Sequence, residues 1–309
     1  MNSDKKILEA NELLQEAEKH MKTSFFKWKP DLDSAAHSFE KAALCFKVAK
    51  RLDEAKDAYL RAADCHGLNK ALFHSAKDFE QAAMILKDQK NYDESVKLIK
   101  RASQLYRQYG SVDTAAIMLE RGAKIMETPN PTEAIELYMK ASEVAENEDK
   151  LRQAVDLLGK AARLMVKMKF MTDAAGVLKK ERDIYIELEN YQSAFRSTAI
   201  LVLVFLYSND YVAADKIFKA SFDLDGFAEH ESSYLLQEML EAYDNQDGEG
   251  VLRISKMPYF TYLDNEYTKL ARGLTAPGES KKANAHSVEL GATGGGEDES
   301  GEGDLSFLL

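Results

Sequence analysis

The stretch LRQAVDLLGKAARLMVKMKFMTDA, residues 151–174, contains one short pattern twice. In each copy a large apolar residue is followed three positions later by a small one, Leu151 by Ala154 and Met171 by Ala174. A second small residue, Ala161, comes seven positions after Ala154. Spacings of three, four and seven positions lie on one face of an α-helix. The stretch therefore predicts a helix, a short turn and the start of a second helix.

The same pattern extends over most of the chain. Large and small residues recur in this order with a period of about 20 residues, which indicates a repeat protein. The pairs are Leu32/Ala35, Leu52/Ala55, Phe73/Ala76, Tyr92/Ser95, Val112/Ala115, Pro131/Ala134, Leu151/Ala154, Met171/Ala174, Tyr191/Ala194 and Tyr211/Ala214. A second large residue often follows the small one after four positions, as at Phe39, Tyr59, Leu119, Tyr138, Leu158, Leu178 and Phe218.

Two consecutive units form a helical hairpin of about 40 residues, and neither helix can bury its apolar face without its neighbours. The sequence thus predicts an all-α fold, a superhelical solenoid of antiparallel helix pairs. It is similar to tetratricopeptide repeats but exceeds their usual length of about 34 residues. We assign residues 1–228 to this solenoid and 229–274 to a C-terminal helical cap. Residues 275–309 are expected to form a flexible, acidic, glycine-rich tail that ends in leucines.

Composition limits the class of protein. The net charge of −11 argues against binding of nucleic acid, because phosphate contacts need a cationic surface. The most apolar run, residues 199–207, is too short for a membrane span, and the N-terminus does not resemble a secretory signal. Cys45 and Cys65 occupy the same phase of the repeat and are expected to be small buried residues. We therefore expect a reduced, cytoplasmic protein.

Motifs for catalysis or cofactor binding are not found. The six histidines lack the paired spacing of metal ligands, and no phosphate-binding loop is present. Residues 244–249 lack the ladder of oxygen ligands that a calcium loop requires. The sequence predicts no catalytic residues, no metal, no cofactor and no small-molecule substrate, so we expect a binding protein.

The segment MKTSFFKWKPD, residues 21–31, follows the first expected helix and is unusually rich in aromatic residues. It contains Phe25, Phe26 and the single tryptophan, Trp28, among three lysines. The residues alone leave two interpretations open. The aromatic side chains either fold back onto the first helix pair or remain free to contact another surface.

With these hairpins, this aromatic segment and the acidic, leucine-ended tail, the chain resembles the soluble NSF attachment protein (SNAP) family, and most of all its gamma isoform. NSF is the N-ethylmaleimide-sensitive fusion ATPase. The resemblance implies a non-enzymatic adaptor whose concave face binds a four-helix SNARE complex of the syntaxin type. It also implies recruitment and stimulation of the hexameric NSF ATPase, which disassembles SNARE complexes in vesicle-mediated transport, such as ER-Golgi transport, and in membrane fusion. The protein would be cytoplasmic and peripherally bound to membranes.

The resemblance also implies functional residues at the N-terminal end. The loop after the first helix attaches family members to membranes, and Phe25 and Phe26 fall in this loop with Trp28 beside them. The neighbouring Lys27 and Lys29 would contact anionic lipid.

At the C-terminal end, the segment YLLQEMLEAYDNQ resembles the part of the family that contacts the ATPase. Glu241 and Asp244 match its acidic positions, whereas Asn245 stands where another acid is expected. A leucine close to the C-terminus stimulates ATP hydrolysis in the family, and Leu308 is its counterpart here. This tail is longer than the family pattern and ends in Phe-Leu-Leu.

The SNARE-binding face follows the family least well, because Ile117 and Asp156 occupy positions where basic residues are expected. Lys160, Arg163 and Lys167 form a basic row that could contact an acidic bundle instead, or could simply be a solvated helix face. The alternative function is a tetratricopeptide-like scaffold for short acidic peptides or other trafficking proteins. The length of the hairpins argues against this alternative, because tetratricopeptide units are shorter.

Overall fold

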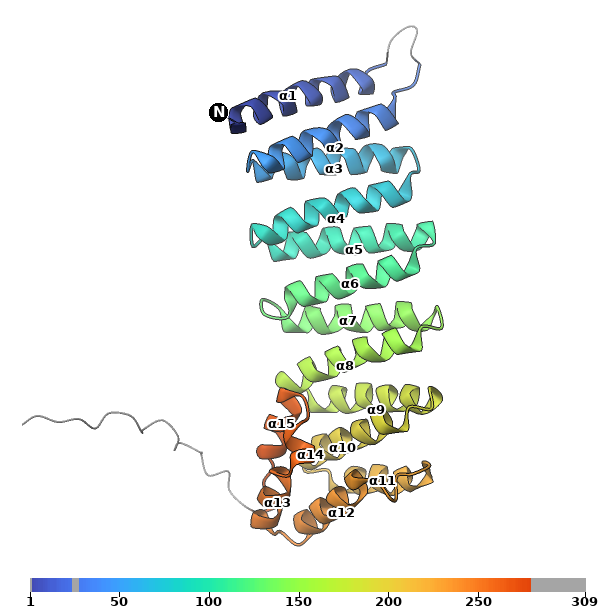
Figure 1. The fold of residues 1–309 in the computed structure, drawn as a ribbon, viewed down its shortest axis with the longest axis vertical. Coiled ribbons are helices and arrows are strands. Elements are labelled where there is room, and N and C mark those ends of the chain that lie inside the picture. The colour runs from blue at the N-terminus through green and yellow to red at the C-terminus, as the bar shows by residue number, and fades with distance from the viewer. Residues whose placement is uncertain (1, 24–27, 279–309) are drawn as a thin grey trace, which may run out of the picture.

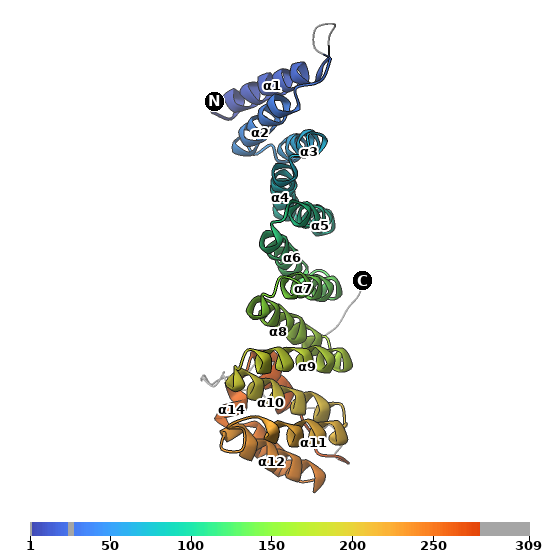
Figure 2. The same ribbon diagram turned by 90° about the vertical axis from the view of Figure 1, so that its right-hand side faces the viewer.

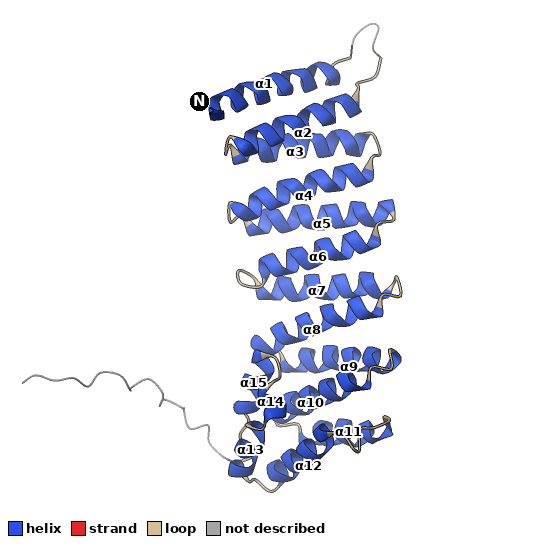
Figure 3. Ribbon diagram, viewed as in Figure 1, coloured by secondary structure: helices blue, strands red, loops and turns tan. Residues whose placement is uncertain are grey.

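The computed structural model describes residues 2–23 and 28–278. All regular elements in these ranges are helices (Figure 3), which confirms the predicted all-α class. They are α1 (Asn2–Met21), α2 (Leu32–Val48), α3 (Leu52–Leu68), α4 (Leu72–Asp88), α5 (Tyr92–Tyr109), α6 (Val112–Met126), α7 (Pro131–Glu146), α8 (Leu151–Lys167), α9 (Met171–Glu187), α10 (Tyr191–Tyr207), α11 (Tyr211–Ala220), the short 3-10 helix η1 (Ser221–Asp223), α12 (Glu231–Asp244), α13 (Gly248–Ser255), α14 (Pro258–Thr261) and α15 (Asn265–Arg272).

The helices from α1 to α11 stack one below another as antiparallel pairs (Figure 1). In the side view, the even-numbered helices from α2 to α8 lie along one side of the stack, and α3, α5 and α7 lie along the other (Figure 2). The middle helices are seen nearly end-on in this view, whereas α9 to α11 are seen from the side, so the stack twists along its length. The predicted superhelical solenoid is confirmed.

The pattern of large and small residues sets where the helices begin. Nine of the predicted apolar residues are the first residues of helices, and the exception is α4, which begins at Leu72, one residue before Phe73. The second large residues, including Phe39, Tyr138 and Leu158, are buried between helices. Burial of a side chain of this size contributes about 1.5–3 kcal/mol. Each helix thus contributes one apolar layer to the core.

Small residues let neighbouring helices approach closely. Ala62 and Ala82 have no exposed surface. The hydroxyl of Ser75 on α4 donates to the backbone carbonyl of Ala63 on α3 at 2.8 Å, and Ser95 makes the same contact with Ala83 one helix later. A side-chain hydroxyl can reach the backbone of the next helix only where no large side chain separates the two.

Short turns reverse the chain between helices. After α2, the N–H of Lys50 donates to Lys47 O at 3.1 Å and that of Arg51 to Phe46 O at 2.9 Å, which is the Schellman arrangement. Lys50 is left-handed, with φ of 60°, and Arg51 already caps α3. Left-handed residues recur at the corresponding positions Lys70, Lys90, Gly110, Asp149, Lys169, Glu189 and Asn209. The constant length of helix plus turn explains the regular period of the sequence pattern.

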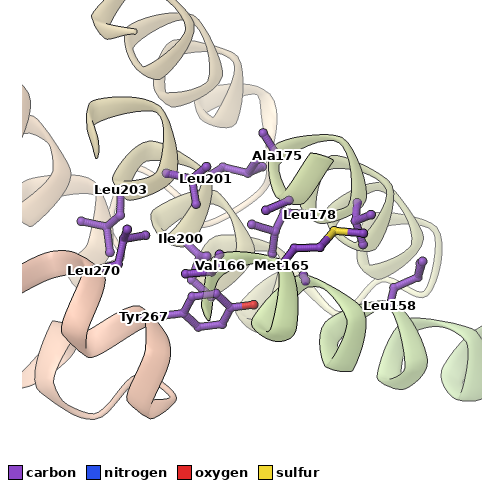
Figure 4. Packing of buried hydrophobic residues seen from close by; sticks show 14 of the residues in the cluster. Leu158, Met165, Val166, Ala175, Leu178, Ile200, Leu201, Leu203, Tyr267 and Leu270 are labelled. Carbon is purple, nitrogen blue, oxygen red and sulfur yellow. The ribbon is translucent and has the colours of Figure 1, made fainter. Parts of the chain in front are cut away.

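The regular stack ends after α11, and the last helices fold back on it. Tyr267 and Leu270 of α15 pack against Val166 of α8 and against Ile200 and Leu203 of α10 (Figure 4). Helices α12 to α15 therefore share one apolar cluster with the end of the solenoid. The boundaries that we assign to the solenoid, the cap and the tail stay a prediction.

The region after α12 is divided into three short helices. Pro258 begins α14 because it lacks the N–H that would be needed to continue α13.

Cys45 and Cys65 are buried and free, as predicted. None of the helices in the described ranges combines the length and the apolar character needed to cross a bilayer.

Candidate partner-binding sites

The described residues of the connection between α1 and α2, 22–23 and 28–31, lie at the N-terminal end of the stack, far from α12 and α13 (Figure 1). A backbone hydrogen bond joins the two ends of the connection: the N–H of Asp31 donates to His20 O at 3.0 Å. The Asp31 carboxylate caps α2 by accepting a hydrogen bond from Ser34 N at 3.1 Å, and it lies 3.6 Å from the His20 ring. The two ends of the connection are thus held together by the helices on either side.

Trp28 is the one aromatic residue of this connection that the structure describes, and it is 87% exposed. Lys22 and Lys29 are exposed on either side of it. Trp28 therefore does not fold back onto the first helix pair. Phe25, Phe26 and Lys27 lie outside the described residues, so their predicted role is untested.

The predicted ATPase contact lies on the last turn of α12. Glu241 and Asp244 are one helical turn apart and both are exposed. The side chain of Gln237 donates to the Glu241 carboxylate at 2.9 Å, and no basic residue occupies this turn. The C-terminus of a helix carries partial negative charge, so two carboxylates here are unfavourable by about 0.3–1 kcal/mol each. The arrangement creates an exposed negative surface at a cost in stability.

Tyr243 fixes the position of this acidic turn. Its hydroxyl donates to Leu206 O at 3.1 Å and lies 3.0 Å from Asn209 Oδ1. Its ring stacks on Tyr211 with the centroids 6.3 Å apart. Burial and the Asp244 carboxylate raise the pKa of Tyr211. The acidic turn is thereby held against the connection between α10 and α11, whereas Leu308 lies outside the described residues.

The predicted basic row lies on α8, but acids of the same chain surround two of its members. Lys160 Nζ lies 3.0 Å from a Glu120 carboxylate oxygen on α6 and also pairs with Asp156. Arg163 donates to Asp264 at 3.3 Å, just before α15. Lys167, at the end of α8, is exposed.

A buried polar cluster, which was not predicted from the sequence, interrupts the repeat at α9. The two positions that hold small residues in α8 hold Glu181 and Arg182 in α9, and both are buried. Arg182 donates from Nε to Thr198 Oγ1 at 3.0 Å, and its NH2 group is 3.3 Å from Ser221 Oγ. Burial raises the pKa of Glu181 to about 7, although Ser197 donates to its carboxylate.

The same cluster joins the solenoid to the last helix. Asp264 accepts hydrogen bonds from Arg163 at 3.3 Å and from Arg196 at 3.4 Å. These groups and Glu181 line a cavity of about 100 Å³. The sequence signal that could have located this cluster is the presence of two charged residues, Glu181 and Arg182, at positions of α9 where α8 has alanines. Its link to Asp264 could not be found in this way, because Arg163 and Asp264 are 101 residues apart.

The sequence of this chain was compared with those of known protein families and known proteins. Residues 8–254, from α1 to α13, match the profile of the soluble NSF attachment protein family. A gamma-soluble NSF attachment protein of Dictyostelium discoideum is 30% identical over 280 residues, which are 91% of this chain and 86% of the relative. The protein of the same name from Arabidopsis thaliana is 25% identical over 264 residues, or 85% of this chain and 91% of the relative.

Two solved structures show weaker likeness. BtubC from P. vanneervenii and a circular tandem repeat protein each align with a TM-score of 0.37 at 12% identity. They cover 72% and 85% of this chain, and 90% and 75% of their own chains. The family profile and both curated relatives agree with the resemblance seen in the repeats and the two ends of the chain. The chain belongs to the soluble NSF attachment protein family.

Proposed function

We propose that this protein is an adaptor that binds assembled SNARE complexes and recruits the NSF ATPase to disassemble them, in vesicle transport and membrane fusion. Membership of the family carries this proposal, because the matched residues 8–254 include the solenoid and the acidic helix α12. Proteins of this family are non-catalytic adaptors, so the prediction that the chain is not an enzyme is confirmed.

A solenoid offers one long surface, which suits a rod-shaped partner such as a four-helix bundle. The basic row of Lys160, Arg163 and Lys167 is our candidate for contact with an acidic bundle. Lys167 is exposed, whereas Lys160 and Arg163 must exchange an acid of their own chain for an acid of the partner. We therefore expect Lys167 to contribute most, and the row to favour association rate and specificity over affinity.

The connection between α1 and α2 is our candidate for membrane attachment at the cytoplasmic face. Phe25, Phe26 and Trp28 would each contribute about 1.5–3 kcal/mol on burial among lipids, before ordering costs. Lys27 and Lys29 would each add about 1 kcal/mol near anionic headgroups. Contact of this strength is reversible, and several adaptors on one membrane-anchored bundle would act together.

The opposite end is our candidate for contact with the ATPase. Glu241 and Asp244 present two carboxylates on one exposed turn of α12. Leu308 is expected to stimulate ATP hydrolysis, with Leu308→Ala lowering stimulation and leaving SNARE binding unchanged. Membrane and ATPase would then contact opposite ends of the stack (Figure 1).

One experiment tests the adaptor function. A preassembled SNARE four-helix complex is incubated with the protein and the NSF hexamer, with ATP or with a non-hydrolysable analogue. We expect a complex of all three in the analogue and release of free SNAREs in ATP. Failure of the protein to bind the SNARE complex, or binding without recruitment of NSF, would refute the proposal.

A further inference from the structure

Three residues from consecutive helices meet between the first hairpins of the stack: Glu40 of α2, His66 of α3 and Asp78 of α4. The Nε2 atom of His66 lies 3.5 Å from a Glu40 carboxylate oxygen and 3.7 Å from Asp78 Oδ2. One donor atom from each residue lies within 4.8 Å of both others. Their side chains therefore point toward one common centre.

His66 and Asp78 are buried, but they lack hydrogen bonds that buried polar groups normally have. Asp78 is 2% exposed and His66 is 9% exposed. Among the described residues, neither His66 ring nitrogen nor Asp78 Oδ2 has a hydrogen-bond partner. Buried polar atoms without a hydrogen-bond partner are rare in folded proteins, and these three atoms point to a missing ligand.

The donor set identifies the class of that ligand. One imidazole nitrogen and two carboxylate oxygens suit Zn²⁺, which binds such donors at about 2.0–2.2 Å in tetrahedral geometry. Neighbouring donors then lie about 3.4 Å apart, close to the 3.5 and 3.7 Å that separate His66 from the two carboxylates. The Glu40 side chain is 30% exposed, so it can close on the ion and leave a fourth position for water. We propose that Glu40, His66 and Asp78 form a Zn²⁺-binding site.

The bound cation would join three successive helices through their side chains. The apolar contacts among helices α2, α3 and α4 are made by alanines and a few large residues, such as Phe39 and Tyr59. They follow directly on the connection that carries Trp28. A cation at this centre would therefore make the N-terminal hairpins more rigid without contacting that connection.

Direct binding tests the site in the full chain. The protein is stripped with EDTA, and Zn²⁺ and Co²⁺ are titrated by calorimetry and by the visible absorption of tetrahedral Co²⁺. We expect one ion per chain, tetrahedral Co²⁺ absorption, and weaker affinity by at least about tenfold in His66→Gln and Asp78→Asn. Glu40→Gln is a third variant at a partly exposed position, where the fold is not at risk; it should also weaken binding.

Hydrogen exchange locates the effect. Zn²⁺ should slow exchange in α2, α3 and α4 and leave α7 to α10 unchanged. The matched control is His20→Gln, because His20 also has carboxylates within 4 Å but is about a third exposed. This control should bind Zn²⁺ as the unchanged protein does.

Three results would overturn the assignment. The first is no Zn²⁺ binding by the unchanged protein at micromolar free metal. The second is equal affinity in the unchanged protein and in all three ligand variants. The third is protection by Ca²⁺ or Mg²⁺ but not by Zn²⁺, which would exclude a nitrogen-containing transition-metal site.

Discussion

At the scale of single residues, Glu181 departs most from the repeat. It occupies a small-residue position, and burial raises its pKa from about 4.5 to about 7. The protonated form is thus favoured in the folded protein. Its contribution to stability is complete below about pH 4.5 and is lost as the pH rises through about 7. The folded protein should therefore be less stable at pH 8 than at pH 6.

Glu181→Gln tests this dependence. The variant should raise the free energy of unfolding at pH 8 on the order of 2 kcal/mol and flatten the change between pH 6 and 8. Urea unfolding at pH 6 and at pH 8 measures the free energy of unfolding and its change with pH. Hydrogen exchange in α9 shows whether the effect is local to this helix. Glu136→Gln, at an exposed position in the middle of α7, should change neither quantity. An unchanged pH profile in Glu181→Gln would contradict the argument.

Gly110 is the one glycine among the left-handed turn residues of the stack, with φ of 95°. Gly110→Ala should lower the free energy of unfolding by about 1 kcal/mol, because a side chain disfavours this conformation. The melting temperature should fall by about 2–4 °C. Gly176→Ala is the matched control, since Gly176 is helical and the position that an added Cβ would take is open. It should raise stability, and a fall in both variants would contradict the turn argument.

At the scale of elements, α12 combines poor helix electrostatics with a predicted binding role. Glu241→Gln with Asp244→Asn should raise the stability of α12, because both carboxylates lie at its negative end. The same change should weaken recruitment of NSF severalfold, as measured by co-sedimentation. Glu231→Gln is the control. Because Glu231 lies in the first turn, where a carboxylate is favourable, its loss should lower the stability of α12 and leave recruitment of NSF unchanged. Recruitment that is insensitive to the double change would remove α12 from the ATPase contact.

The connection between α1 and α2 is tested by changing its aromatic residues. Phe25→Ser with Phe26→Ser should lower binding to anionic liposomes at least tenfold, since apolar burial supplies most of the attraction. Circular dichroism should show unchanged helicity. Tyr262→Ser is the control, because Tyr262 is 85% exposed and belongs to the C-terminal end. Equal liposome binding by all three proteins would exclude this connection as the attachment site.

At the scale of the whole molecule, the apolar core is unevenly divided. Helices α1 to α6 hold three small clusters, whereas one large cluster extends from Val96 to Ala276. Repeat proteins can open locally, because each repeat contacts only its neighbours. Hydrogen exchange in mild urea should therefore show α2 to α4 opening before α8 to α10. Simultaneous exchange of both regions would show a single cooperative unit instead.

Sequence reasoning was accurate wherever the signal was local. The helix starts at Leu32, Leu52 and Tyr92 followed directly from apolar residues at fixed spacing, since these residues face the neighbouring helix in each repeat. The candidate sites were less accessible. Trp28 was found from composition alone, but only the structure showed it to be exposed. The pairing of Arg163 with Asp264 joins distant parts of the chain, and no spacing rule predicts such a contact.

Local sequence was sufficient for the all-helical class, the period of the repeat and the register of each helix, because these depend on interactions within one repeat and with the next. Long-range packing set where the repeat ends. The return of α15 onto α8 and α10 depends on buried surfaces that are distant in the chain. Stacking also brought Glu40, His66 and Asp78 together, because side chains on separate helices meet only when the helices are in contact. Local periodicity contains no information about such contacts.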